Sequence, residues 1–216
     1  MGVSYLTEFA ARQLLGECGL ALPRAHLART EAQAQQHAKK IGYPVVLKLM
    51  SRDILHKSDA GGVKVVQNRP ELSAAFSQIL KNAKKYNPSA RIDGILVEEQ
   101  LSGMELVIGA KKDAQFGHVI VFGIGGVFVE LMKDISIRLV PISRNDAKAM
   151  IGEIKGYEML LGYRGKKPVN LAAVQDALLS VSKMVAKHPE IHELDINPLF
   201  ADERGAIVGD ARIALG

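Results

Sequence analysis

Apolar and polar residues along the first hundred positions follow a pattern that predicts alternating helices and strands. Residues 7–20, 30–40 and 70–86 place apolar side chains at helical spacing, and Thr7 and Thr30 can cap the first two of these helices. Between them lie short runs rich in β-branched residues and bounded by Gly or Pro, which is typical of strands. We expect these strands at residues 25–28, 45–49, 63–66 and 94–98.

The second half of the chain has a different pattern, in which several strands follow one another. Helices are expected at residues 146–154 and 171–187, and strands at 105–111, 117–122, 127–130, 138–141, 191–198 and 206–211. The chain leaves its first sheet near Glu98. We therefore expect an α+β fold of two α/β lobes, with residues 1–98, including the N-terminal helix, in one and residues 99–216 in the other.

Composition narrows the classes of function. With 216 residues, 48% hydrophobic and 24% charged, the chain is an ordinary globular protein and not mainly disordered. The longest uncharged apolar stretch, 119–129, is too short to span a bilayer, and no secretion signal is visible. The single cysteine, Cys18, cannot form an internal disulfide, so we expect a cytoplasmic protein.

The charge balance is mildly basic, since 28 Lys and Arg face 23 Asp and Glu, for a net charge of +5. This excess alone does not choose between nucleic acid, nucleotide and no anionic ligand. Proteins that bind single-stranded nucleic acid usually stack bases on aromatic side chains. This chain has only five Tyr, six Phe and no Trp. We expect neither a nucleic-acid partner nor a membrane.

Two glycine clusters are candidate phosphate contacts. Gly123–Gly126 follows a strand, but position 128 is Phe and a strand, not a helix, is expected next, which excludes a dinucleotide fingerprint. Gly61 and Gly62 lie between two strands. Paired glycines let backbone N–H groups approach a phosphate, so this segment can fold over a triphosphate as a flap. A plain turn is the alternative reading at both clusters.

Lys48 and His56 are candidates for phosphate chemistry. Lys48 lies inside an apolar strand, from which it can point into a cleft at a phosphate, or else face solvent. His56 comes directly before the Gly61–Gly62 segment. A neutral imidazole is a competent nucleophile toward phosphorus, although an ordinary surface histidine is the alternative.

Carboxylates gather where the two lobes should join. Glu98 and Glu99 end a strand, and Glu105 follows shortly afterwards. Such groups can meet ribose hydroxyls or an adenine amino group. Exposed loop charges are the alternative.

A third polar group lies near the C-terminus. In a strand, alternate side chains share a face, so Glu193, Asp195 and Asn197 should point the same way, and Asp210 on the partner strand can lie beside them. Oxygen ligands of this kind suit Mg²⁺, which keeps waters and bridges substrate phosphates. A solvent-facing polar edge is the alternative.

Taken in order, these features resemble the ATP-grasp nucleotide-binding fold. They are most similar to the ATP-grasp, or β, part of ADP-forming acyl-CoA synthetases (acetate–CoA ligase, ADP-forming), which are related to succinyl-CoA synthetase. The matching stretches cover nearly the whole chain. They are Pro44–Lys48, His56–Gly62, Leu96–Glu99, Phe122–Glu130, Ser136–Arg138, Gly162–Gly165, Leu194–Leu199 and Gly209–Arg212.

The resemblance implies a role for each candidate residue. Lys48 would hold the phosphates of ATP or ADP, and the backbone from Glu99 to Leu101 would hold adenine. Glu98 would lie near the adenine amino group and Glu105 on the ribose. The remaining assignments are that Gly61 and Gly62 cover the phosphates, that Asn197 and Asp210 bind Mg²⁺ with Asp195 close by, and that His56 carries phosphate.

The family reaction converts acid, ATP and CoA reversibly into acyl-CoA, ADP and phosphate. Nothing in the sequence resembles the CoA-binding domain, so we expect a subunit or domain that needs a CoA-binding α partner, through which CoA and a small carboxylic acid are handled. Two other functions remain open. One is another ATP-grasp carboxylate ligase, against which His56 weighs, and the other is a nucleotide-binding regulatory module without turnover.

Overall fold

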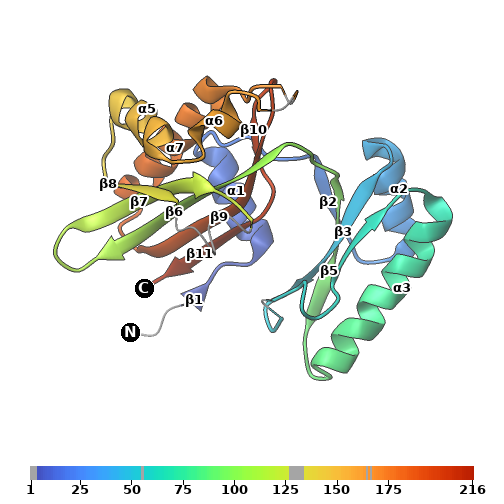
Figure 1. Cartoon of the computed structure of the whole chain (residues 1–216). Helices are drawn as coiled ribbons and strands as arrows, with labels where there is room; N and C mark the ends of the chain where they lie inside the picture. The colour runs from blue at the N-terminus through green and yellow to red at the C-terminus, as the bar shows by residue number, and fades with distance from the viewer. Residues whose placement is uncertain (1–3, 55, 127–133, 164, 166) are drawn as a thin grey trace. The chain divides into compact units, whose positions relative to one another are not determined.

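The computed structural model describes residues 4–54, 56–126, 134–163, 165 and 167–216 (Figure 1). Contacts within the chain divide it into two compact units. Unit 1 comprises Met1–Leu22 and Leu101–Gly216, and unit 2 comprises Pro23–Gln100. None of the helices in the described part of the chain combines the length and hydrophobicity that a membrane crossing requires.

Unit 2 is a four-stranded antiparallel sheet with two helices. The strand order is β2-β5-β3-β4, and Figure 1 shows both helices on the same face of the sheet. The elements are β2 (Ala25–Ala28), α2 (Glu31–Ile41), β3 (Val45–Ser51), β4 (Val63–Val66), α3 (Arg69–Tyr86) and β5 (Ile92–Glu99).

Local sequence signals account for the helices of unit 2. Thr30 caps α2, because its side chain accepts the N–H of Gln33 at 3.2 Å, and Gly42 ends that helix with a φ of 93°. Asn68 caps α3 in the same way through the N–H of Glu71. The apolar sides of both helices pack on one face of the sheet, in a core that includes Ala34, Ala38, Leu72, Phe76, Ile79, Leu47, Leu49 and Val97.

Unit 1 is a seven-stranded antiparallel sheet in the order β1-β11-β9-β6-β7-β8, with β10 paired to β9. Its strands are β1 (Ser4–Tyr5), β6 (Met104–Asp113), β7 (Gly117–Ile124), β8 (Ile135–Leu139), β9 (Ile191–Ala201), β10 (Ala206–Val208) and β11 (Ala211–Leu215). Its helices are α1 (Glu8–Glu17), α5 (Arg144–Glu153), α6 (Tyr157–Leu160) and α7 (Leu171–Lys187).

The helices of unit 1 share one core with its sheet. The apolar stripe of α7 packs with every second residue of the central strands, as the period-2 geometry of a strand requires. Buried members include Val174, Leu178, Val181, Leu106, Ile108, Ile120, Phe122, Leu194 and Ile196. The intervening residues of β6, β7 and β9 therefore lie on the opposite face of the sheet, which we call the open face.

The N-terminal segment belongs to unit 1, whereas the sequence pattern predicts it in the first lobe. β1 pairs with β11, so that Ser4 lies opposite Leu215, and the N–H of Leu6 donates to the carbonyl of Ile213 at 2.9 Å. Helix α1 is buried in the unit 1 core through Ala11 and Leu15. Sequence pattern predicts α1 correctly but not its partner, because that partner lies about 200 residues later in the chain.

The C-terminal strands differ from the simple hairpin that we expected. Besides its pairing with β6, β9 pairs with two further strands, β10 near its end and β11 near its start. The expected strand at 206–211 is accordingly interrupted at Gly209 and Asp210. The strand expected at 127–130 lies outside the described residues.

Candidate functional site

The predicted phosphate lysine lies on β3 within unit 2 and is buried. Lys48 is 9% exposed, so the alternative of a solvent-facing position is wrong. Its Nζ lies 2.8 Å from Oε1 of Glu98 on the neighbouring strand β5. Burial of both charges is acceptable because they are paired.

The segment that follows β5 is tied to β2 and to the start of β3. The Glu99 carboxylate accepts from Nε of Arg24 at 2.6 Å, and the Glu99 N–H donates to the Arg24 carbonyl at 3.0 Å. The Gln100 N–H reaches the carbonyl of Pro44 at 3.5 Å. Glu98 is 2% exposed, so it is not an exposed loop charge. Of the predicted adenine segment, Glu99 and Gln100 thus use their N–H groups within unit 2.

His56 is exposed, on a segment that is fixed at its beginning. Ile54 is buried in the unit 2 core. The Asp53 carboxylate accepts the Arg91 N–H at 2.7 Å, and the Ser51 hydroxyl donates to the Arg91 carbonyl at 2.7 Å. Sequence reasoning missed these anchors, because nothing near Asp53 indicates that Arg91 lies beside it. The geometry is compatible with both readings of His56, a phosphate carrier and a surface side chain.

The two glycines after His56 form a closed turn in this structure. The Gly62 N–H donates to the Lys57 carbonyl at 2.7 Å, and the Gly61 N–H donates to the Ser58 carbonyl at 3.0 Å. Gly61 has a φ of 60°, and its carbonyl accepts from Nδ2 of Asn82 at 3.0 Å. Both N–H groups are therefore engaged within the turn, which supports the turn reading for this conformation.

In unit 1, the predicted ribose and metal residues share the open face of the sheet. Along β9, Leu194 and Ile196 are buried in the core, while Asp195 is half-buried and Asn197 is exposed. Glu105 on β6 is exposed beside buried Leu106, and it lies opposite Phe200 in the β6–β9 ladder. The alternation predicted from sequence for β9 is thus present in the structure.

Asp210 comes alongside these residues just before β11. The Asn197 N–H donates to the Asp210 carbonyl at 3.1 Å, and Arg212 lies opposite Asp195 in the β9–β11 ladder. Burial raises the pKa of Asp195, with Glu193 and Asp210 adding to the rise and Arg212 opposing it. A cation beside Asp195 would oppose this rise in its pKa.

The donor set fits Mg²⁺ better than a softer metal. Among the residues that the structure describes, no three His, Cys, Asp or Glu side chains are grouped as a metal site. Asp195, Asp210 and Asn197 instead offer two carboxylates and an amide, all oxygen donors. Mg²⁺ is usually bound by one or two carboxylates together with waters and phosphate oxygens.

The second glycine cluster packs directly on Glu105. The Gly125 N–H donates to the Glu105 carbonyl at 2.7 Å, and a Cβ at Gly125 would lie 3.1 Å from that oxygen. A side chain at Gly126, which has a φ of 68°, would approach Oε2 of Glu105. Glycine is therefore required here by a close approach of two backbones, and the predicted turn adjoins the predicted ribose residue.

Arg138 on β8, at the end of the matching stretch Ser136–Arg138, has a partner within unit 1. Its guanidinium donates to the Glu153 carboxylate of α5, which also accepts the Ser136 hydroxyl at 2.9 Å. This contact raises the pKa of Arg138 and lowers the pKa of Glu153. Arg164, in the matching stretch Gly162–Gly165, lies outside the described residues.

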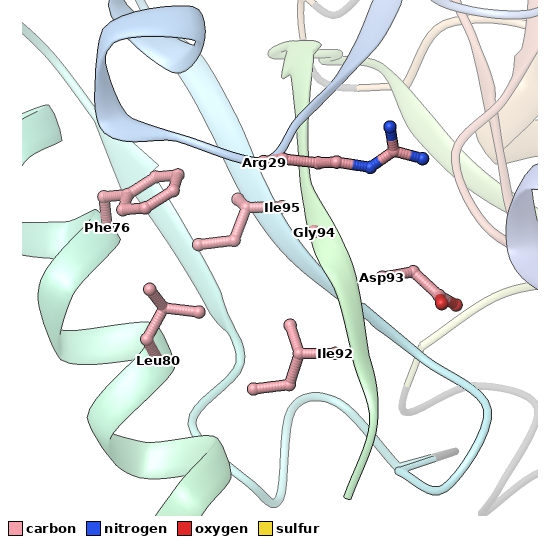
Figure 2. A pocket seen from close by; sticks show the side chains of 7 residues that line it. All are labelled: Arg29, Phe76, Leu80, Ile92, Asp93, Gly94 and Ile95. Atoms are coloured by element: carbon pink, nitrogen blue, oxygen red, sulfur yellow. The ribbon is translucent and has the colours of Figure 1, made fainter.

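Unit 2 also contains a pocket of about 440 Å³ on the helix side of its sheet (Figure 2). Figure 2 shows four apolar side chains around it, with Asp93 on the other side of β5. They are Phe76, Leu80, Ile92 and Ile95. Ile95 belongs to the helix-covered core, whereas Lys48 and Glu98 lie on the opposite face. The pocket is therefore separate from the lysine.

Comparison with known proteins identifies the family. The model for the ATP-grasp domain matches residues 1–215. Among curated proteins, the chain is 45% identical over 212 residues to the β subunit of acetate–CoA ligase (ADP-forming) I of Pyrococcus furiosus, which covers 97% of this chain and 91% of that one.

Solved structures agree with this match. An acetyl-coenzyme A synthetase 1 from Ca. Korarchaeum cryptofilum, in complex with coenzyme A and Ca-AMPCP, matches with a TM-score of 0.95 and 43% identity, over 99% of this chain and 94% of that one. A second structure of that enzyme, with coenzyme A and Mg-AMPPCP and its phosphohistidine segment pointing towards the nucleotide binding site, matches with a TM-score of 0.86 and 39% identity, over 99% and 93%. The chain belongs to the ATP-grasp family, in the group that includes the β subunits of ADP-forming acetate–CoA ligases.

Proposed function

We propose that the chain is the ATP/ADP-binding part of an ADP-forming acyl-CoA synthetase. The observation that carries this proposal is the likeness to the Pyrococcus furiosus β subunit, 45% identical over 97% of this chain and 91% of that subunit. In the reaction, a carboxylic acid, ATP and CoA give acyl-CoA, ADP and phosphate, reversibly.

The predicted site residues would supply the contacts that such a reaction needs. Phosphoryl transfer depends on positioning and on charge neutralisation more than on covalent help from the protein. Lys48 would contact the phosphates, the backbone from Glu99 to Leu101 would hold adenine, and Glu105 would bind the ribose. Mg²⁺, held by Asp195, Asn197 and Asp210, would neutralise phosphate charge when bound.

His56 would carry the phosphoryl group. Its imidazole nitrogen attacks phosphorus, so that a P–N bond forms while the bond to the donor breaks, and the β-phosphate oxygen of ADP then displaces the imidazole to give ATP. Two features support this role, the exposure of His56 and the anchoring of the preceding residues by Ile54 and Asp53. Anchors near an exposed nucleophile favour a reproducible position of that nucleophile.

The glycines after His56 would cover the phosphates. Because the Gly61 and Gly62 N–H groups are engaged within the turn, covering a phosphate with them requires the turn to open. Phosphate covering by Gly61 and Gly62 would therefore depend on this opening.

A CoA-binding partner would supply the rest of the enzyme. The Pyrococcus furiosus relative is named a β subunit, and the Korarchaeum structure contains coenzyme A and a phosphohistidine segment directed at the nucleotide site. By this likeness, CoA and the carboxylic acid would be handled in an α subunit or domain, which exchanges phosphate with His56.

The first test is nucleotide binding, measured by calorimetry with ADP and Mg²⁺. We expect binding by the wild-type chain and a loss of affinity of at least about tenfold for Lys48→Met, because a charge-assisted contact contributes about 1.5–3 kcal/mol. Lys81→Met, an exposed lysine on α3, is the matched control. Absence of nucleotide binding by the wild-type chain would end the proposal.

The second test is turnover with the CoA-binding subunit of a related enzyme. We expect His56→Gln to retain nucleotide binding and to lose ATP formation from acyl-CoA, ADP and phosphate, whereas His192→Gln should behave as wild type. Binding with no turnover in any combination would favour the regulatory module. ADP release with an amine acceptor and without CoA would favour another carboxylate ligase.

A further inference from the structure

Both side chains of the ion pair between Lys48 and Glu98 are largely shielded from solvent. The Nζ–Oε1 distance is 2.8 Å, and the side chains are 11% and 3% exposed. A pair this buried differs from the exposed ion pairs of the same chain, such as Arg144–Asp176, whose side chains are 59% and 61% exposed. Solvent screening weakens the exposed pairs much more than the buried one.

The sheet of unit 2 fixes this pair in place. β3 and β5 are its two central strands, and in their antiparallel ladder Lys48 lies opposite Leu96 while Val46 lies opposite Glu98. Lys48 and Glu98 are therefore diagonal neighbours. Their strand neighbours Leu47, Leu49 and Val97 belong to the helix-covered core. Both charged side chains must then project from the other face, toward each other.

We propose that Glu98 is a positioning residue, which holds the Lys48 ammonium in the direction of the nucleotide phosphates, and that it does not recognise the adenine amino group. This inference rests on the proposed function of Lys48. Lysine has a flexible four-carbon stem and three N–H donors, so that a bond to one carboxylate fixes its direction and is compatible with a bond to a phosphate oxygen.

The neighbouring carboxylate strengthens the assignment. Glu99 points to the opposite side of β5 from Glu98, as strand alternation requires, and pairs with Arg24. The two consecutive glutamates therefore have different partners. The one that family resemblance places near adenine is held by the lysine that contacts phosphate.

The two roles predict different responses to the base of the nucleotide. Inosine nucleotides lack the 6-amino group of adenine and keep the same phosphates. With the CoA-binding subunit present, ATP or ITP formation is measured from acyl-CoA, phosphate and either ADP or IDP. We expect Glu98→Gln to lower kcat at least about tenfold for both nucleotides, with a smaller change in KM.

A double-mutant cycle identifies the residue through which Glu98 acts. If Glu98 acts on Lys48, then Glu98→Gln has little further effect on turnover in the Lys48→Met background. The coupling free energy then equals most of the effect of Glu98→Gln alone. Asp176→Asn, which breaks the exposed pair with Arg144, is the control and should leave turnover unchanged. If wild type does not use IDP, the cycle decides alone.

The outcomes separate this inference from the proposed function. The positioning role is overturned if Glu98→Gln loses turnover with ADP but not with IDP. It is also overturned if Glu98→Gln has the same effect in the Lys48→Met background as in wild type. Both outcomes leave the proposal of nucleotide binding intact. Absence of Mg-nucleotide binding in wild type overturns the proposed function itself. If Glu98→Gln does not fold, as judged by circular dichroism, Glu98→Asp keeps the charge with a shorter reach, and the same two signatures apply to it.

Discussion

The main-chain N–H of Asn197 donates to the carbonyl oxygen of Asp210 at 3.1 Å, which joins the two predicted magnesium ligands across neighbouring segments of unit 1. Asp210 also accepts the N–H of Ala211 through its side chain at 3.0 Å, so its carboxylate is held by its own backbone. One predicted ligand therefore lies in strand β9, and the other lies in the two-residue connection between β10 and β11, which this hydrogen bond ties to β9.

This arrangement predicts that Asp210→Asn weakens the binding of the Mg²⁺ that accompanies the nucleotide. We expect the Mg²⁺ concentration needed for half-maximal ADP binding to rise by about tenfold, which corresponds to about 1.4 kcal/mol. Calorimetry at a series of Mg²⁺ concentrations measures it. Glu193→Gln, on the same strand face, is the control, and an equal response of both variants would argue against the assignment.

Gly62→Ala should destabilise unit 2. A Cβ at this position would lie 2.9 Å from the Lys57 carbonyl oxygen and 3.0 Å from Cβ of Leu49, and neither atom belongs to the end of a flexible side chain. Overpacking of this kind costs about 1–3 kcal/mol. The midpoint of urea unfolding, followed by circular dichroism, should fall, and an unchanged midpoint would show that the turn yields easily.

Gly152→Ala is the opposite case and should stabilise unit 1. Gly152 lies in helix α5, and a Cβ there would meet nothing within 4 Å. Replacing glycine by alanine inside a helix reduces the entropy lost on folding and is expected to raise stability by about 0.5–1 kcal/mol. A higher urea midpoint would confirm this, and a lower one would contradict it.

The stability of unit 2 should decrease in mild acid through His37. Its ring stacks on His26 with a centroid distance of 4.8 Å, and burial, followed by His26 and Lys40, lowers the pKa of His37. Between the lowered folded value and the unfolded value of about 6.5, the unfolded state binds more protons. The stability contributed by neutral His37 is therefore fully present above the pKa of the unfolded state, and it is lost as pH falls through the pKa of the folded state.

Two measurements check this sign. The His37 ring resonances in NMR should titrate below their ordinary range, and His26→Ala should move the His37 pKa upward. The free energy of unfolding should fall from about pH 7.5 to about pH 5.5 by more in wild type than in His37→Asn. A smaller fall in wild type would reverse the assignment.

Asn82→Ala should loosen the segment that bears His56. The Asn82 side chain donates to the Gly61 carbonyl at 3.0 Å and accepts from Nε2 of Gln78 at 2.6 Å. Losing such a bond costs about 0.5–1.5 kcal/mol, which should raise local amide exchange in residues 57–62 severalfold. Lys81→Ala, on the same helix, is the control, and equal exchange in both variants would contradict the anchoring role.

Sequence pattern predicted most elements of the fold because their signals are local. Thr30 and Gly42 mark the two ends of α2, and the alternation of β9 correctly placed Asp195 and Asn197 opposite Leu194. These predictions depend on residues within one turn or one strand. Such signals can be recognised without knowledge of the tertiary structure.

The contacts that sequence could not predict join residues far apart in the chain. Lys48 and Glu98 are 50 positions apart, and their pairing depends on the register of β3 against β5. The bond between Asp53 and Arg91 depends on the same sheet. Family resemblance supplied roles for the predicted residues, but it placed Glu98 near adenine and did not show its lysine partner.

The discontinuity of unit 1 has a consequence for the order of folding. Unit 2 is contiguous and complete once residue 100 has been synthesised, whereas unit 1 needs β11, at the C-terminal end, to pair with β1. On the ribosome, domains fold as their residues emerge. Unit 2, with Lys48 already beside Glu98, can therefore form first, while β1 and α1 remain unpaired until β11 has been synthesised.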